Sequence, residues 1–199
     1  MSSRLIESIK NRRTHYALSK KSPVSDEKVI ELIEQATLHT PTAFNSQNGR
    51  VLVLLNDQHD KLWKFAYDAL KAIVPAESFP ATAEKINSFA AAYGTVLFFE
   101  DTATVKALQD QFPLYQHNFP VWSQQANGML QSNVWVALSE LGLGASLQHY
   151  TELIESKVRE EWNVSPEWKL TAQMPFGQPV TPPSEKTFMP LHERVKVYA

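Results

Sequence analysis

The longest helical pattern in the chain covers residues 121–141, and its apolar side chains are not confined to one face. They are Met129, Leu130, Val134, Trp135, Ala137, Leu138 and Leu141. A surface helix buries one apolar stripe, whereas a helix that is apolar on several sides must be covered on several sides. The pattern therefore predicts a helix at the centre of a subunit or in an interface between two subunits. Gly142 and Gly144 are expected to end it, because glycine is favoured just past a helix C-terminus.

Shorter helix and strand patterns surround this helix. Apolar spacing predicts helices over 3–12, from an N-cap at Ser25 to just before Pro41, from a cap at Asp57 to Leu70, over 82–92, and from Ile154 to Trp162. Strands are predicted at 51–55 and 95–99, both buried, at 145–150, and at 170–174, where 175–179 breaks the strand. An extended arm is predicted towards the C-terminus, after Pro182. This order predicts one α+β domain over residues 1–199, with a small sheet flanked by helices.

Composition excludes several classes of function. The formal net charge is −2, so nothing steers the chain to nucleic acid or to an anionic membrane surface. No apolar run approaches the roughly 20 residues that a membrane-spanning helix needs. The absence of cysteine excludes disulfides and thiolate chemistry and fits a cytoplasmic location. We therefore expect a cytoplasmic protein that binds neither nucleic acid nor membrane.

No side chain stands out as an obligatory nucleophile or base. The six histidines lack the paired spacing of a metal site, and Ser146 is not in a G-x-S-x-G sequence. The acidic pairs Glu100-Asp101 and Glu160-Glu161 are expected on the solvated surface. If the protein is an enzyme, a bound cofactor would carry the difficult chemistry, with no metal and no catalytic side chain.

Two polar segments are candidates for ligand binding. Arg12 and Arg13, followed by Thr14, offer planar charged donors and a hydroxyl that suit phosphate oxygens. The alternative is a basic helix end, because cations near a helix C-terminus complement its dipole. The segment 40–49 is rich in amides and hydroxyls, which can bind the edge of a heterocycle or their own backbone.

The order of these segments resembles that of the FMN-dependent nitroreductase family. The resemblance covers essentially the whole chain and is carried by Arg12-Arg13-Thr14, the Thr40-to-Gln47 segment, Gly142-Leu143-Gly144-Ala145 and Lys186. Segments 93–101, 118–123 and 147–150 are similar to one branch, which includes the fatty-acid-repression-mutant type of yeast and the copper-induced nitroreductase of lactic acid bacteria. The resemblance implies a three-layer α+β fold with a mainly antiparallel sheet. It also implies a homodimer whose subunits exchange C-terminal arms and hold two FMN molecules in the interface.

The resemblance also assigns the cofactor-binding residues. Arg12, Arg13, Thr14 and Lys186 would bind the phosphate, and Tyr16 would lie near the flavin ring. Thr42, Ala43 and Asn45 would reach the flavin from the partner subunit, and Gln148 and His149 would line the other side of the ring. The chain departs from the common family pattern at Tyr16, where a cation is frequent, and at Lys186-Thr187-Phe188, where a second tail cation is either missing or supplied elsewhere, with Arg194 as the candidate.

The function implied is a two-electron, ping-pong oxidoreductase of the stress response. NADH or NADPH would reduce FMN, and a small aromatic oxidant, either a nitroaromatic or a quinone, would then reoxidise it. Two alternatives stay open: a slowly turning over flavoprotein that senses fatty acids or metals, and a dimeric interaction protein without flavin.

Overall fold

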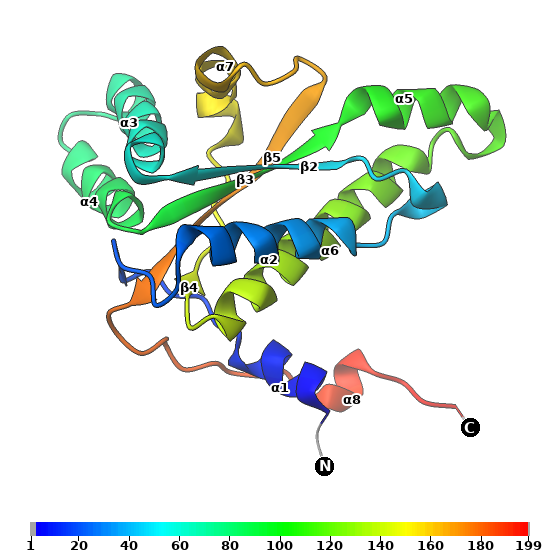
Figure 1. The fold of residues 1–199 in the computed structure, drawn as a ribbon, viewed down its shortest axis with the longest axis horizontal. Coiled ribbons are helices and arrows are strands. Elements are labelled where there is room, and N and C mark those ends of the chain that lie inside the picture. The colour runs from blue at the N-terminus through cyan, green and yellow to red at the C-terminus, as the bar shows by residue number, and fades with distance from the viewer. Residues whose placement is uncertain (1–2, 199) are drawn as a thin grey trace.

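The computed structural model describes residues 3–198, and its centre is a five-stranded antiparallel sheet (Figure 1). The strands are β1 (Leu18–Ser19), β2 (Gly49–Leu55), β3 (Gly94–Asp101), β4 (Gly144–Ala145) and β5 (Trp168–Pro179). Their order is β1-β5-β3-β2, and β4 pairs with β5 beside this path. Strand β2 is thus at one edge of the sheet.

Helices cover both faces of the sheet. They are α1 (Arg4–Asn11), α2 (Asp26–Leu38), α3 (Asn56–Ile73), α4 (Phe79–Ala90), α5 (Thr102–Gln111), α6 (Phe119–Glu140), α7 (Thr151–Trp162) and α8 (Leu191–Arg194), with 3-10 turns η1 (Ala43–Asn45) and η2 (Pro113–Tyr115). Alternation along β3 sends Val96 and Phe98 into one core, with α2 and α6, and Leu97 and Phe99 into a second core, with α3, α4 and α7. The predicted three-layer α+β fold is therefore confirmed.

The long helix was correctly predicted, but it is buried on one side rather than several. In α6, Ala126, Leu130, Val134 and Leu138 form a buried stripe against α2 and the sheet. Met129 points outward and is 42% exposed. The helix ends near Gly142, whose φ of +78° is the left-handed conformation that favours glycine, whereas Gly144 belongs to β4. Within the described residues of one subunit, α6 is therefore covered by α2 and the sheet on one side and exposed on the other.

The break expected at 175–179 was wrong, because β5 continues to Pro179. The strand continues by changing partners, from β3 along its first part to β4 and β1 near its end. Pro175 has no amide hydrogen, but its carbonyl accepts from the Ser146 amide at 3.2 Å. At Gly177 a Cβ atom would lie only 2.5 Å from the Ser19 carbonyl oxygen, so glycine lets β1 approach closely.

Other local predictions were also wrong. Helix α5 was not predicted, and Glu100 and Asp101, expected on the surface, are buried. The Asp101 side chain accepts from two α5 amides and so caps this helix. Asp57 does not cap α3, which starts one residue earlier without a side-chain cap.

The remaining strand and arm predictions need smaller corrections. Within 51–55 only Leu54 is buried, because β2 is an edge strand. Of the predicted strand 145–150, only Ala145 is in β4, and the arm contains α8 before it becomes extended. The helix predicted over 82–92 starts earlier, at Phe79, with Pro80 in the first turn of α4. The Ser25 cap of α2 is confirmed, since its side chain accepts from the Lys28 amide.

A buried polar cluster lies between α3, α4 and β3. His59 is 1% exposed, and its two ring nitrogens lie 2.9 Å from the Thr95 hydroxyl and 3.2 Å from the Ala90 carbonyl oxygen. The Ala90 carbonyl can only accept, so Nε2 carries the proton and Nδ1 accepts from Thr95. Trp63 Nε1 donates to the same hydroxyl at 2.9 Å. The cluster is fully satisfied only with neutral histidine, and burial lowers the pKa of His59 below its ordinary value of 6.5.

This cluster predicts acid destabilisation. The unfolded chain binds a proton at His59 before the folded chain does, so the free energy of unfolding should fall as the pH drops through about 6.5 towards the lower folded pKa. For one proton the slope is at most about 1.4 kcal/mol per pH unit. Urea unfolding at several pH values should show a flatter dependence in His59→Gln than in the wild type. His117→Gln, at an exposed histidine, is the control and should show the wild-type pH dependence. If His59→Gln also showed the wild-type slope, His59 would not be the source of the acid destabilisation.

Candidate functional site

The predicted basic segment lies where α1 ends and the chain turns back to the sheet. Arg12 is the C-cap of α1, and its guanidinium lies over the ring of Trp135 at 4.4 Å from the ring centre. Burial, and then the charge of Arg13, lower the pKa of Arg12. Arg13 instead donates a hydrogen bond to the carbonyl oxygen of Ser184 in the C-terminal tail. The two adjacent cations thus contact different parts of the molecule.

The basic segment lies beside strand β4. Thr14 forms a parallel bridge with Ala145, and the His15 amide donates to the Ala145 carbonyl oxygen at 3.0 Å. Gly144 permits this approach, since a Cβ atom there would lie 2.8 Å from the Cβ of His15. The fold therefore joins two segments that the sequence separates by about 130 residues.

The same region includes the predicted ring-lining residues. Gln148 is buried and exchanges two backbone hydrogen bonds with Gln173, of 2.7 and 2.9 Å, while His149 is exposed. The Gln173 side chain accepts from the Tyr150 amide at 2.6 Å, but its Nε2 is buried without a hydrogen-bond partner in the described chain. A buried donor of this kind is costly unless a ligand or water accepts from it. Gln173 is 0% exposed, so this donor lies inside the core and not on a surface that a ligand reaches.

Lys186 and Tyr16 border this region. Ser184, the residue that Arg13 contacts, lies two positions before Lys186, so the tail brings a second exposed cation towards Arg13. The Lys186 ammonium lies 5.1 Å from the centre of the Phe188 ring. Tyr16 is 60% exposed and can meet a ligand or another chain.

The third predicted group, Thr42, Ala43 and Asn45, lies elsewhere. This turn packs at the start of α6, where the Phe44 ring lies 5.3 Å from that of Phe119 and stacks on Trp122 at 6.2 Å. Arg12 contacts α6 thirteen residues beyond Trp122, at Trp135, which corresponds to about 20 Å along the helix. Within one chain the turn and the basic segment are therefore at different ends of α6.

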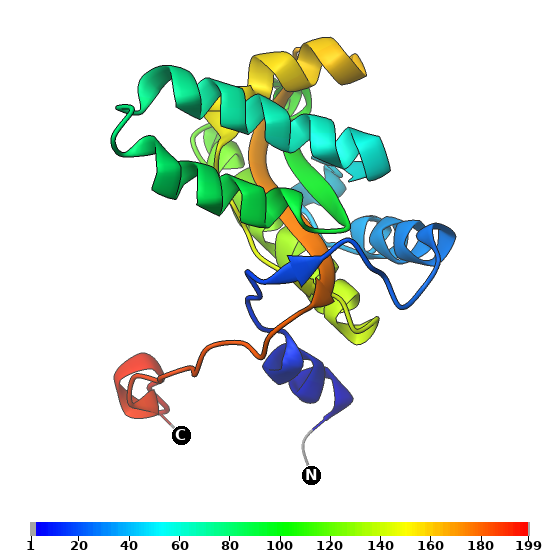
Figure 2. The same ribbon diagram turned by 90° about the vertical axis from the view of Figure 1, so that its left-hand side faces the viewer.

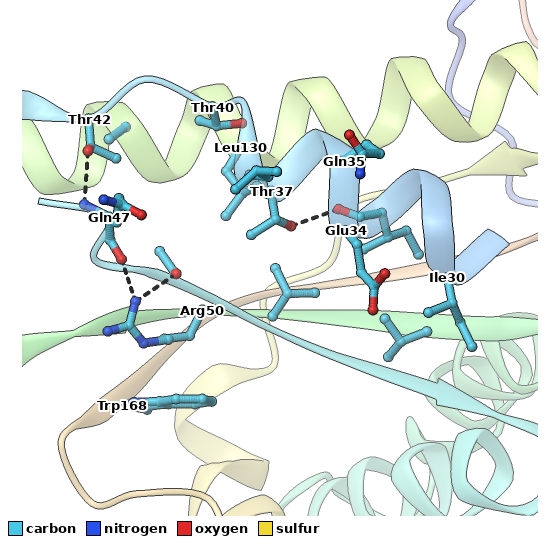
Figure 3. A pocket seen from close by; sticks show the side chains of 16 residues that line it. Ile30, Glu34, Gln35, Thr37, Thr40, Thr42, Gln47, Arg50, Leu130 and Trp168 are labelled. Atoms are coloured by element: carbon cyan, nitrogen blue, oxygen red, sulfur yellow. Dashed lines mark hydrogen bonds between the residues drawn. The ribbon is translucent and has the colours of Figure 1, made fainter. Parts of the chain in front are cut away.

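A groove of about 640 Å³ runs along the edge strand β2 and below α2 (Figure 3). Its apolar walls come from α2 through Ile30 and Leu38 and from β2 through Val51 and Val53. Thr42, Gln47 and Arg50 lie at one end. The sequence analysis did not identify this groove or Arg50, because neither carries a local motif.

The described residues form neither a metal site nor a membrane-spanning helix. No group of three or more histidine, aspartate or glutamate side chains is placed to hold a metal ion in the described part of the chain. Among the helices formed by residues 3–198, none combines the length and apolar character needed to cross a membrane.

Comparison with known proteins gives consistent results. The model of the nitroreductase family matches residues 9–178. The nitroreductase FRM2 of Saccharomyces cerevisiae is 34% identical over 186 residues, which cover 92% of each chain. The nitroreductase CinD of Lactococcus lactis, solved with nicotinic acid, is 51% identical with a TM-score of 0.91, over 98% of this chain and 100% of that one. CinD was also solved with chloramphenicol and with 4-nitrophenol.

A more distant structure shares the fold. A chain from Desulfovibrio desulfuricans, solved in complex with FMN, is 22% identical with a TM-score of 0.69, over 100% of this chain and 99% of that one. The yeast and Lactococcus matches confirm the predicted branch. A family match over most of the chain, together with a similar relative of nearly the same length, settles the assignment: the protein belongs to the nitroreductase family.

Proposed function

We propose that this nitroreductase-type oxidoreductase binds FMN and uses NADH or NADPH to reduce small nitroaromatics and quinones, as part of stress defence in the cytoplasm. The observation that carries the proposal is the contact of Arg13 with Ser184 beside the Thr14–Ala145 bridge, because it brings the tail that carries Lys186 next to Arg13 and Thr14. The FMN complex of the Desulfovibrio chain and the 4-nitrophenol and chloramphenicol complexes of CinD support the cofactor and the substrate class.

The residues present suit a phosphorylated ring with several acceptors. Arg12, Arg13 and Lys186 would hold the phosphate through charge-assisted hydrogen bonds, with Thr14 as a further donor. Gln148 and His149 would line the ring, and Tyr16 would lie next to it. Arg12, Arg13 and Thr14 are partly exposed, and Tyr16 and Lys186 are exposed, so a ligand can reach these side chains.

The chemistry divides between cofactor and protein. Bound FMN would supply a two-electron carrier between the nicotinamide and the oxidant. The chain itself would bind, orient and shelter the two planar reactants, which is how a protein without an obligatory base or nucleophile accelerates such a transfer. Reductant and oxidant would use the same space in turn, which gives ping-pong kinetics.

The placement of Thr42, Ala43 and Asn45 supports a site completed by two subunits. These residues lie at the other end of α6 from Arg12 of the same chain. They could therefore contact only an FMN whose phosphate is held by Arg12 of a second subunit, across a dimer interface. The C-terminal segment after β5 leaves the sheet and runs away from the helical layers (Figure 2). It carries exposed apolar side chains, including Phe188, Met189 and Leu191. The groove beside the edge strand β2 is the surface on which a partner's arm would pack.

The proposal is tested by the visible spectrum of the purified protein. We expect a yellow protein with the two visible flavin bands, which NADH or NADPH bleaches and 4-nitrophenol or a quinone restores. A colourless protein that gains no flavin on refolding with FMN would overturn the proposal. If neither NADH nor NADPH bleached the bound flavin in stopped-flow mixing, the alternative of a sensing flavoprotein with slow turnover would be favoured instead.

A further inference from the structure

The turn that carries Thr42, Ala43 and Asn45 has an unusual backbone. Phe44, Asn45 and Gln47 have φ angles of 57°, 50° and 48°, in the left-handed region that residues other than glycine seldom occupy. Asparagine tolerates this region, whereas phenylalanine is a clear outlier there. Such conformations persist only where surrounding contacts impose them, and they concentrate at sites of function.

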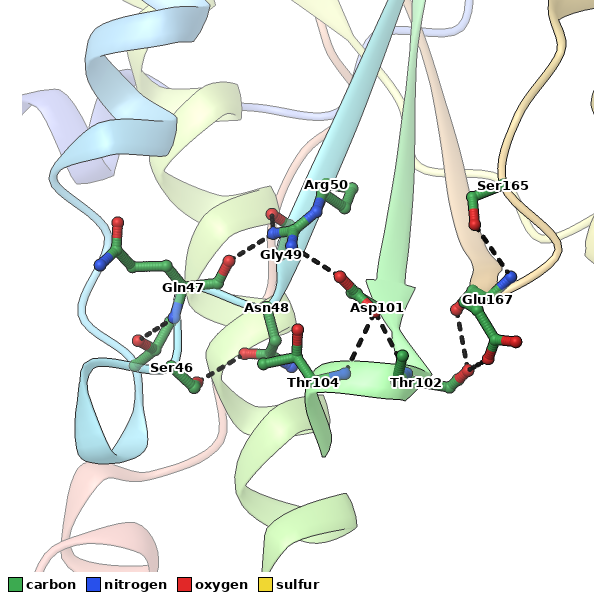
Figure 4. A network of polar contacts seen from close by, with 12 residues as sticks. Ser46, Gln47, Asn48, Gly49, Arg50, Asp101, Thr102, Thr104, Ser165 and Glu167 are labelled. Atoms are coloured by element: carbon green, nitrogen blue, oxygen red, sulfur yellow. Dashed lines mark hydrogen bonds and ion pairs between the residues drawn. The ribbon is translucent and has the colours of Figure 1, made fainter. Parts of the chain in front are cut away.

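One side chain connects this turn to the sheet. Arg50, near the start of β2, donates from Nη1 to the carbonyl oxygen of Gln47 and, at 3.1 Å, to that of Gly49 (Figure 4). Its Nη2 donates to Oδ2 of Asp101 at 2.6 Å. The Arg50 side chain is 29% exposed and that of Asp101 is 13% exposed, so water screens this pair only partly.

The far end of this connection is firmly held. Asp101 ends β3, and its Oδ1 accepts from the amides of Ala103 and Thr104 at 3.1 and 3.2 Å. Trp168 of β5 lies below the Arg50 guanidinium, and the central carbon of the guanidinium is 5.6 Å from the centre of the Trp168 ring. Contacts with β3 and β5 therefore fix the position of the guanidinium, and the first turn of α5 helps to hold Asp101. The fixed guanidinium in turn restrains the Gln47 carbonyl oxygen to which it donates.

The polar contacts within residues 42–47 are local, whereas the next residue, Asn48, is held from two sides: its Nδ2 donates to the Ser123 hydroxyl of α6, and its carbonyl oxygen accepts from the Asp101 amide at 2.9 Å. The Gln47 amide donates to the Thr42 hydroxyl at 2.9 Å, and Ser46 donates to Oδ1 of Asn48 at 3.0 Å. The Phe44 ring packs 4.8 Å from that of Phe112. Aromatic packing limits where the turn lies, but hydrogen bonds to a carbonyl oxygen determine how its peptides are oriented.

We propose that Arg50 is a positioning residue of the FMN site: by holding the Gln47 carbonyl, it orients the turn that presents Thr42, Ala43 and Asn45 to the flavin of the partner subunit. This rests on the proposed function. The planar fork of arginine can bind a carboxylate and two carbonyl oxygens at once, whereas the ammonium of lysine is a point charge. The role therefore depends on the geometry of the side chain as well as on its charge.

The test compares Arg50→Gln and Arg50→Lys with the wild type, after FMN binding by the wild type has been established. Arg50→Gln should raise the dissociation constant of FMN by about 10-fold, which corresponds to the loss of about one hydrogen bond to the flavin. It should also change the visible circular dichroism of the flavin at saturating FMN. Arg50→Lys should recover the melting temperature through its pairing with Asp101, but not the FMN affinity or the flavin signal.

Arg159→Gln is the matched control. Arg159 lies on α7, has a side chain 32% exposed and shares the neighbour Trp168 with Arg50, but its hydrogen bonds go to Glu155 at 3.0 Å and to the Trp168 carbonyl oxygen at 3.1 Å rather than to the turn. It should bind FMN as the wild type does. Unchanged FMN affinity and flavin dichroism in Arg50→Gln, equal losses in Arg159→Gln, or full recovery in Arg50→Lys would each overturn the positioning role. If Arg50→Gln does not fold, Arg50→Lys carries the test alone. A wild type that takes up no FMN would instead show that the proposed function itself has failed.

Discussion

Replacing Arg13 by alanine is expected to weaken FMN binding by about 10- to 100-fold. A hydrogen bond to a charged group contributes about 1.5–3 kcal/mol, and each 1.4 kcal/mol corresponds to a factor of ten in affinity. Arg13 is bonded to Ser184 in the tail that carries Lys186, whereas Arg12 lies over the Trp135 ring of α6. We therefore expect a larger loss from Arg13→Ala than from Arg12→Ala.

The measurement is a titration of apoprotein with FMN, followed by flavin fluorescence at two ionic strengths. The wild-type affinity should fall more steeply with salt than that of Arg13→Ala, because the variant makes one charge contact fewer. Lys10→Ala is the control, since Lys10 is an exposed cation of α1, three residues before Arg13, and pairs with Glu7 at 3.1 Å. Undiminished FMN affinity in Arg13→Ala would contradict the role assigned to this residue.

Ending the chain after Thr187 is expected to convert a dimer into a monomer and to abolish FMN retention. The deletion removes exposed apolar side chains that include Phe188, Leu191 and Val195. Each large apolar side chain buried against a partner contributes about 1.5–3 kcal/mol. Loss of these contacts would leave the groove beside β2 uncovered and would separate the two halves of the proposed flavin site.

Sedimentation velocity and the protein-bound flavin absorbance report the two effects together. Full-length Lys186→Ala is the control, because it lacks the tail charge but keeps the arm. It should remain dimeric and bind FMN more weakly. A shortened chain that sediments as the wild type does and keeps its flavin would show that the arm holds neither the dimer nor the site.

The helices and the central strands could be predicted because their signals are local. Apolar spacing identified α2, α3, α6 and α7 within a few residues of their observed ends. The continuation of β5 and the two-residue strand β1 could not be predicted, because pairing with distant strands creates them. Helix α5 was missed although Asp101 is a recognisable cap, since the acidic pair was interpreted as surface.

The candidate site divides in the same way. Arg12, Arg13, Thr14 and Lys186 could be named from residue chemistry and family resemblance, and Gln148 and His149 from the resemblance alone. Nothing in the sequence indicated that Arg13 contacts Ser184, because 171 positions separate them. Arg50 escaped notice for a related reason: a single arginine before a strand is common, and only its bonds to Gln47 and Asp101 distinguish it.

By itself, the sequence determined the secondary structure built from local periodicity, the α+β class and the chemical types available for ligand binding. Those properties depend on residues that are neighbours along the chain. The tertiary structure alone decided that the tail meets the end of α1, that the 42–47 turn lies at the other end of α6, and that Arg50 connects this turn to Asp101. Such contacts depend on how β3 and β5 pair and on which core each helix covers, and these choices are made by packing across the whole molecule.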